Sequence, residues 1–404
     1  MKNIKQTLLL GAGLLFMTAC TPEDVDPNAD LKTKVVNNYC EIVYASYEDS
    51  YNKAMDLQTA INTLVTTPTQ TSFDAAKIAW LAAREPYGQT EAYRFYDGPI
   101  DDSDGPEGAL NAWPLDENYI DYTRDNTGGV SNTGIIYDLT NYPTITASIL
   151  SGANEVGGEK NISIGYHAIE FLLWGQDHID VNTNVGQGGN RSYTDYTNTA
   201  MNHTRRGEYI QACAQLLIDD LAILKSEWAP NGSYRTYFEG LSADEALSKI
   251  LTGAGVLSKS ELAGERMFTA LEANSVDNPQ EDEHSCFADN THRDIITNAQ
   301  GITNILAGTY TSVSGSVVGS TEYSILTLVT KTDATKGADL RAKITAATAK
   351  VLAIPMPFDK TVTEENVNDN GSVLQAVTAL QTQGDAIAEA ATVLGLTIST
   401  ELPD

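Results

Sequence analysis

Apolar residues recur at steps of three and four along most of this chain, a spacing typical of helices that bury one face. Residues 31–65 show it most clearly, and Pro68 should end the helix there. The alternation of apolar and polar residues that half-buried strands require is missing, so all-β and α/β folds have little support. We therefore predict an all-α fold.

The same spacing predicts helices in the rest of the chain. Ser72 can cap a second helix that runs through Trp80, and Pro86 should end or kink it. Further helices are expected near residues 142–155, 162–174, 204–228, 242–274, 286–307, 321–351 and 373–394. The polar, glycine-containing segments 97–135 and 180–198 are predicted to be long loops.

The helical pattern breaks near residues 229–240, where Pro, Asn, Gly and Ser follow one another. We place a domain boundary there, between a first helical bundle of residues 35–230 and a second of residues 231–398. The whole chain of 404 residues is long enough to form a substantial hydrophobic core in each.

The N-terminus is typical of a lipoprotein signal, which we assign to residues 1–20. Two lysines precede a short apolar run, and small residues then lead to Cys20, the predicted site of lipidation. Residues 21–34 form a polar, acidic tether that resembles the surface-export signals of Bacteroidetes lipoproteins. We expect a protein of the cell envelope, lipid-anchored to the outer membrane on its periplasmic or surface-exposed face.

Charge and cysteine content exclude several classes of protein. With 25 Lys and Arg against 54 Asp and Glu, the formal charge is −29, which repels nucleic acid and suits a protein that meets cations. Beyond Cys20, the three cysteines Cys40, Cys213 and Cys286 allow at most one disulfide. Because no CxxC spacing occurs, a structural zinc site of the finger type is ruled out.

His167 and Glu170 stand three residues apart in an otherwise apolar segment, so a helix places both side chains on one face. Burying either group without a partner would cost roughly several kcal/mol of folding free energy. The two side chains are therefore expected to contact each other, a metal ion or a polar ligand. A buried His–Glu hydrogen bond with no ligand is the simpler alternative.

A second polar segment combines charges with tyrosines. If the helix continues past Pro86, Arg84 and Glu91 lie two turns apart on one face, with Tyr87 between them. These residues are candidates for ligand binding. A solvated helix face with packed tyrosines would give the same pattern.

The third polar segment, residues 278–294, holds two of the five histidines beside several carboxylates. A helix here would align four polar residues along one stripe: Glu281, Ser285, Asp289 and His292. Nitrogen and oxygen ligands of this kind suit iron, zinc, manganese or copper better than calcium alone. The alternative is a capped helix start that follows a solvated acidic turn.

Residues 165–177, GYHAIEFLLWGQD, resemble the GxHxxE region of the imelysin family, also called insulin-cleaving membrane protease-like proteins. Other blocks of that family resemble, in the same order, residues 80–101, 113–115, 264–267 and 284–292. The resemblance implies two related four-helix-bundle halves with a functional site between them around the motif. It also implies an extracytoplasmic location and a link to bacterial iron uptake.

These features together give the leading hypothesis, a lipid-anchored protein that binds iron, another metal ion or a small iron-bearing ligand during uptake. The sequence does not identify the metal, for which iron and zinc are candidates, or the membrane partner. His167 and Glu170 would supply or orient metal ligands. Four other residues would contribute to ligand binding: Arg84, Glu91, Ser285 and Asp289.

Two alternatives remain open. The imelysin family has been classed among metallopeptidases, but a helical zinc protease of the usual kind needs two histidines four residues apart and a glutamate base. Here a distant histidine such as His284 or His292 would have to complete the site, which the sequence does not specify. The second alternative is a polar network that only holds the two halves together.

Overall fold

The computed structural model describes residues 26–125, 129–177, 188–273 and 283–403, and this part of the chain is almost entirely helical, as predicted. The lipoprotein signal, residues 1–20, and residues 21–25 of the tether lie outside these ranges. The predicted tether is too long at its end, because residues 29–34 belong to the first helix, where apolar positions such as Leu31 pack against the core. In the described ranges, no helix is both long and apolar enough to cross a membrane.

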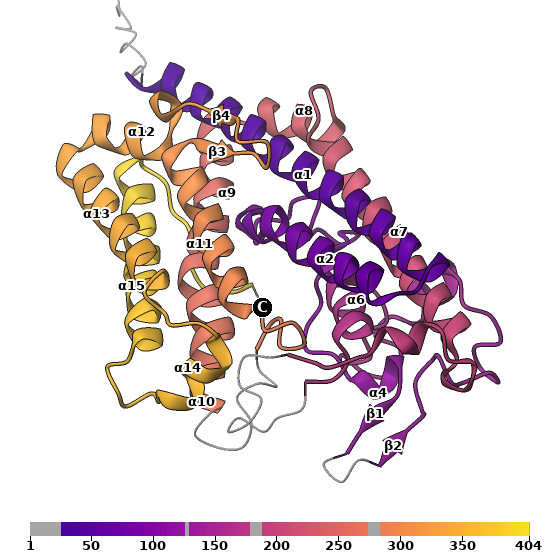
Figure 1. Ribbon diagram of the computed structural model, residues 1–404. Helices are drawn as coiled ribbons and strands as arrows, with labels where there is room; N and C mark the ends of the chain where they lie inside the picture. The colour runs from indigo at the N-terminus through magenta and orange to yellow at the C-terminus, as the bar shows by residue number, and fades with distance from the viewer. Residues whose placement is uncertain (1–25, 126–128, 178–187, 274–282, 404) are drawn as a thin grey trace, which may run out of the picture.

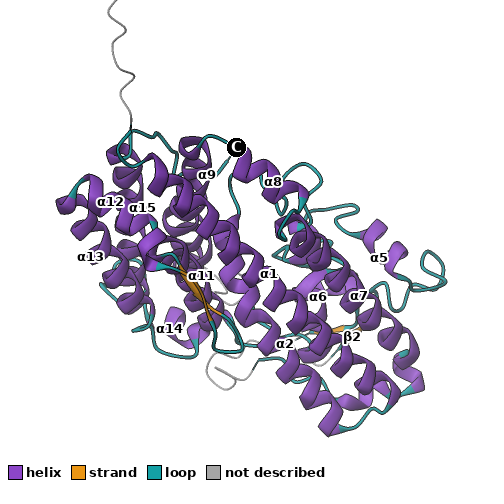
Figure 2. Ribbon diagram, turned by 90° about the horizontal axis from the view of Figure 1, so that it is seen from above, coloured by secondary structure: helices purple, strands orange, loops and turns teal. Residues whose placement is uncertain are grey.

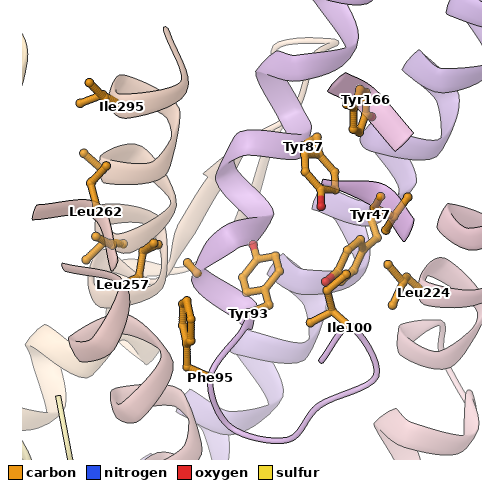
Figure 3. Packing of buried hydrophobic residues seen from close by; sticks show 14 of the residues in the cluster. Tyr47, Tyr87, Tyr93, Phe95, Ile100, Tyr166, Leu224, Leu257, Leu262 and Ile295 are labelled. Carbon is orange, nitrogen blue, oxygen red and sulfur yellow. The ribbon is translucent and has the colours of Figure 1, made fainter. Parts of the chain in front are cut away.

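The first group of helices comes from the N-terminal part of the chain (Figures 1 and 2). The helix α1 (Ala29–Thr66) packs along α2 (Gln70–Thr90) and α7 (His203–Trp228), and α6 (Gly165–Trp174) contacts both α2 and α7. Tyrosines fill much of the interior, including Tyr47, Tyr87, Tyr93 and Tyr166 (Figure 3).

The second group begins with a continuous helical rod of three parts: α9 (Ala243–Val256), the π-helix η4 (Leu257–Phe268) and α10 (Thr269–Ala273). The rod packs with α11 (Thr291–Ala307) and α15 (Ser372–Val393), which α13 (Ala334–Val351) joins on the outer side. The two groups meet chiefly where α2 lies against α11. Gly88 and Gly301 allow this close approach, because a Cβ atom at either position would lie within 2.5 Å of the opposite helix.

Shorter elements connect these helices. They are the helices η1 (Glu91–Tyr93), α3 (Glu107–Leu110), α4 (Glu117–Ile120), α5 (Ala147–Ala153), η2 (Tyr193–Tyr196), η3 (Thr199–Met201), α8 (Ser233–Gly240), η6 (Thr321–Tyr323), α12 (Ile325–Thr332) and α14 (Phe358–Glu364). Two small antiparallel hairpins pair β1 (Thr123–Arg124) with β2 (Val130–Ser131) and β3 (Thr309–Thr311) with β4 (Val317–Gly319).

The predicted cap of the second helix, Ser72, is wrong, and the helix does not end at Pro86, one of the two outcomes predicted for that residue. Thr69 is its N-cap and Ser72 is the reciprocal partner in a capping box, while the helix continues through Pro86 to Thr90. A proline inside a helix removes one backbone hydrogen bond and costs about 3 kcal/mol. Here the turn that follows Pro86 buries Tyr87 and Gly88 against neighbouring helices, and this packing keeps the segment helical.

Two other boundaries differ from the prediction. The segment 321–351 is divided because the Asp333 side chain accepts hydrogen bonds from the backbone amides of Thr335 and Lys336 and starts a new helix, α13. The segment 229–240, predicted to break the helical pattern, contains the short helix α8, which packs against α7 and α1.

Candidate functional site

The helix α6 carries the His167–Glu170 pair through the interior, and all ten of its residues are buried. It starts at Gly165, whose φ of +87° is a conformation that favours glycine. A Cβ atom at Gly165 would lie 2.7 Å from the carbonyl oxygens of Ala109 and Leu110. The indole N–H of Trp80 donates to the carbonyl of Tyr166 at 2.9 Å and fixes the start of α6 against α2.

His167 and Glu170 form the predicted pair. His167 Nδ1 lies 2.8 Å from Glu170 Oε2, and the other carboxyl oxygen, Oε1, accepts a hydrogen bond from the Ala288 amide at 2.9 Å. Burial raises the pKa of Glu170 and, with the nearby His284, lowers the pKa of His167, so this imidazole is neutral at pH 7. His167 Nε2 is buried and has no hydrogen-bond partner among the described residues. Both oxygens of Glu170 are therefore engaged, whereas one ring nitrogen of His167 is not.

A second imidazole lies beside the first. The ring centroids of His284 and His167 are 4.9 Å apart, and the two rings are nearly perpendicular. His284 is only 8% exposed, and its Nδ1 is 3.8 Å from Asp294 Oδ2, too far for a hydrogen bond. Burial and the positive charge of Arg266 lower the pKa of His284. Two neutral imidazoles, each with an unused nitrogen, therefore adjoin in the interior.

A buried polar chain continues from this pair between the two helical groups. Asp294 on α11 accepts hydrogen bonds from Ser285 and from Arg84 on α2, whose Nη2 is 3.1 Å from Asp294 Oδ1. Arg84 also donates to Asn111 at 2.6 Å, and Asn111 donates to Glu91 at 3.1 Å. The two residues predicted to share one helix face, Arg84 and Glu91, are thus joined through Asn111.

The far end of this chain reaches the π-helix η4. Glu91 Oε2 is 2.8 Å from Arg266 Nη2 and 2.8 Å from Arg94 Nη1. Burial opposes ionisation of Glu91, but these two guanidinium groups outweigh it and lower its pKa to about 2. In a π-helix, residues five apart share a face, and Arg266 Nε donates to Glu261 at 3.0 Å.

A cavity of about 450 Å³ opens beside the two imidazoles. Both helical groups supply its walls, which include His284, Trp113, Asn111 and Arg266. His167 does not line this cavity, but Trp113 and His284 both contact the His167 ring, with Trp113 at 5.0 Å between centroids. These two side chains separate His167 from the cavity.

The predicted helical stripe in residues 281–292 is wrong. Glu281 lies outside the described residues, residues 284–289 form turns, and α11 begins only at Thr291. The physical reason is tertiary, because the Ala288 amide donates to Glu170 and is not directed along a helix axis. The Thr291 hydroxyl accepts from the Ser285 amide, which adds a local competitor to helix formation.

The other predicted residues of this segment have different surroundings. Asp289 lies in a turn with a φ of +50°, and burial together with the charges of Asp359 and Asp177 raises its pKa to about 7. No hydrogen bond joins Asp289 to His167 or Glu170 within the described ranges. His292 is half-buried on α11 and lines a different, more apolar pocket.

Several members of the site were not identified from the sequence. Asp294 and Asn111 carried no local pattern that set them apart, and Trp113 and Arg266 stood out only as parts of family blocks. The five-residue spacing of Glu261 and Arg266 would have been informative only if the π-helix had been anticipated. The sequence allowed at most one disulfide among Cys40, Cys213 and Cys286, and in the structure all three are free and buried.

The arrangement does not form a complete metal cage. Among the described residues, no three His, Cys, Asp or Glu side chains are placed to hold one metal ion together. The arrangement offers two neutral imidazoles beside a polar cavity, with one imidazole oriented by a carboxyl group. Such a site can donate ring nitrogens to a ligand that brings its other partners with it.

Comparison with solved structures shows a shared fold. A protein provisionally named iron-regulated protein A precursor, from Parabacteroides distasonis, matches with a TM-score of 0.69 at 19% identity, over 92% of this chain and 96% of that one. An imelysin-like protein from Psychrobacter arcticum matches with a TM-score of 0.60 at 13% identity, over 93% of this chain and 98% of that one.

Comparison of sequences gives two matches, one to a relative over a short segment and one to a family model over most of the chain. This chain is 38% identical over 76 residues to iron-regulated protein A of Synechococcus elongatus, a match that spans 19% of this chain and 20% of that relative. The family model described as imelysin matches residues 43–387, most of the chain, in agreement with the resemblance found in the GxHxxE segment. The protein is therefore a member of the imelysin family.

Proposed function

We propose that this protein binds iron, or another metal ion that substitutes for it, between the two helical groups and serves in bacterial iron uptake. The observation that carries the proposal is the buried Nε2 of His167, which has no hydrogen-bond partner among the described residues and lies beside the imidazole of His284. A buried polar atom without a partner costs about 1–3 kcal/mol, which a ligand would offset. The names of the Synechococcus and Parabacteroides relatives support the connection with iron.

The residues present fit a metal ion carried as cargo. His167 and His284 are neutral, the protonation state in which imidazole is a ligand. Glu170 orients His167 through Nδ1 and leaves Nε2 for the metal, an arrangement common around metal-bound histidines. Water or a small ligand that enters with the metal would occupy the remaining coordination positions. An incomplete protein cage suits an ion that must be released.

Metal titration of the protein lacking residues 1–20 tests this proposal. We expect saturable binding of Fe(II) or Zn(II) near one equivalent by calorimetry, and a loss of affinity of more than about 100-fold in His167→Ala. Glu170→Gln should lose roughly 10–100-fold, since it disturbs orientation rather than a ligand. His203→Ala, which removes a histidine outside the site, is the matched control.

Circular dichroism would establish that each variant remains folded. Equal binding by the unaltered protein and His167→Ala would contradict the assignment of the site. If the folded, unaltered protein binds neither metal, the polar chain is better explained as a structural network between the helical groups.

The proposal includes attachment to the envelope through Cys20. The expected mature chain begins at Cys20 and carries acyl groups there, because the apolar run before it is too short to span a bilayer. Mass spectrometry of the N-terminal peptide from membrane fractions tests this directly. A mature N-terminus elsewhere, with an unmodified Cys20 thiol, would contradict lipid anchoring.

A further inference from the structure

The walls of the 450 Å³ cavity beside His284 are rich in carboxylates. The first helical group and its loops supply Glu107, Glu155 and Glu159, and the π-helix η4 supplies Glu261 and Glu265. These five residues come from three separate segments that meet only in the folded protein. Glu155, Glu159 and Glu265 are all exposed to solvent at the cavity.

The positive charges of the cavity wall are already balanced. Arg94 and Arg266 are its only Lys or Arg residues in the described part of the chain. Arg94 pairs with Glu91 at 2.8 Å and Glu107 at 3.1 Å, and Arg266 pairs with Glu91 at 2.8 Å and Glu261 at 2.9 Å. The two guanidinium groups are therefore fully compensated by carboxylates.

The remaining three carboxylates leave the cavity with an excess of negative charge. Glu155, Glu159 and Glu265 form no ion pair with any described residue. They come from two separate segments of the cavity wall, Glu155 and Glu159 from the loop after α5 and Glu265 from η4. A concave surface with charges of one sign concentrates ions of the opposite sign and repels ions of the same sign.

A histidine shares the wall of the same cavity, with its Nδ1 buried 3.8 Å from Asp294. His284 lines the cavity, is 92% buried, and has a ring nitrogen, Nδ1, without a hydrogen-bond partner among the described residues. This feature is independent of the glutamates and lies next to His167. The carboxylates therefore share the cavity wall with His284, whose ring adjoins that of His167.

We infer that the cargo enters this cavity as a free hydrated metal cation, and that anionic chelates of iron, such as carboxylate complexes, are repelled. Size does not decide between them, since about 450 Å³ can hold a hydrated ion or a compact chelate. Charge does, because the uncompensated carboxylates of the cavity wall repel a negatively charged ligand. This inference rests on the proposed function and specifies its ligand.

The test removes only the uncompensated charges. The triple variant Glu155→Gln/Glu159→Gln/Glu265→Gln should bind hydrated Fe(II) or Zn(II) about 10-fold more slowly at low ionic strength, with a weaker dependence of the rate on salt. The matched control, Asp74→Asn/Asp219→Asn/Asp339→Asn, changes the total charge equally at exposed helical positions outside the cavity wall. The rate at which this control binds the metal should stay within about twofold of the rate for the unaltered protein, since charges beyond a Debye length are screened.

Ferric citrate serves as the anionic probe. The affinity of the unaltered protein for ferric citrate should be at least 10-fold lower than its affinity for hydrated Fe(II). In the triple variant, the ratio of these two affinities should be smaller. Metal binding with an unchanged rate and salt dependence in the triple variant would overturn this inference while leaving the proposed function in place. So would tight binding of ferric citrate by the unaltered protein. A lack of any saturable metal binding by the unaltered protein would overturn the proposed function and this inference together.

Discussion

Asp294→Ala should lower the free energy of unfolding by about 3–5 kcal/mol, because it leaves the guanidinium of Arg84 buried without its charge partner. Each of these two residues is only 2% exposed, and their pair joins α2 to α11 between the two helical groups. Urea denaturation followed by circular dichroism would measure the loss. The double variant Arg84→Met/Asp294→Leu should lose less than the sum of the two single changes, since it leaves no buried charge.

The chain offers a matched control one residue away on each helix. Glu85 and Arg293 also join α2 to α11, with two contacts of 2.7 Å, but both side chains are about 40% exposed. Glu85→Ala should therefore lower the free energy of unfolding by less than about 1 kcal/mol. If Asp294→Ala costs no more than Glu85→Ala, the buried chain does not hold the helical groups together.

The Asp294 effect should also depend on pH. Burial alone would raise the pKa of Asp294, but the positive charge of Arg84 and the hydrogen bond from Ser285 lower it well below its usual range. A carboxyl group whose pKa is lower in the folded state stabilises the protein above its unfolded pKa, about 3.9, and loses that contribution as pH falls. The stability difference between the unaltered protein and Asp294→Asn should therefore shrink below about pH 4.

Gly165→Ala should destabilise the protein by about 3 kcal/mol, although it adds a single methyl group. The positive φ of Gly165 strains any residue with a Cβ atom, at a cost of about 1–3 kcal/mol. The added carbon would also lie 2.7 Å from two carbonyl oxygens of α3, those of Ala109 and Leu110. Denaturant titration should show a lower midpoint than for the unaltered protein.

Gly152→Ala is the matched control for this substitution. Gly152 lies inside α5, and a Cβ atom there would have no neighbour within 4 Å. The control substitution should leave the free energy of unfolding unchanged or raise it by about 0.5–1 kcal/mol, because alanine has a higher helix propensity than glycine. Equal midpoints for Gly165→Ala and the unaltered protein would mean that α6 can shift away from α3.

The polar interior divides into two parts with different properties. Arg84, Asn111, Glu91 and Asp294 engage one another, as a structural network requires. By contrast, His167 has a buried ring nitrogen without a partner among the described residues, and so does its neighbour His284. Buried polar atoms without partners are uncommon in folded proteins, which is why the imidazoles, rather than the arginine and carboxylate chain, form the proposed binding site.

The sequence by itself determined the helical class of the fold and the pairing of His167 with Glu170. Both depend on residues a few positions apart, whose geometry a helix sets directly: the pair lies 2.8 Å apart as the spacing predicts. The long helices α1, α7 and α15 were predicted from periodicity for the same reason. Family resemblance, not local spacing, indicated that distant blocks belong together.

Only the tertiary structure decided which distant groups meet. Arg84 and Asp294 are 210 positions apart, and no local pattern specifies their contact. The turns before α11 show the same dependence, since residues with helical spacing leave the helix where the Ala288 amide reaches Glu170. The acidic cavity likewise exists only where three segments meet, because its position and net charge follow from packing rather than from the order of residues along the chain.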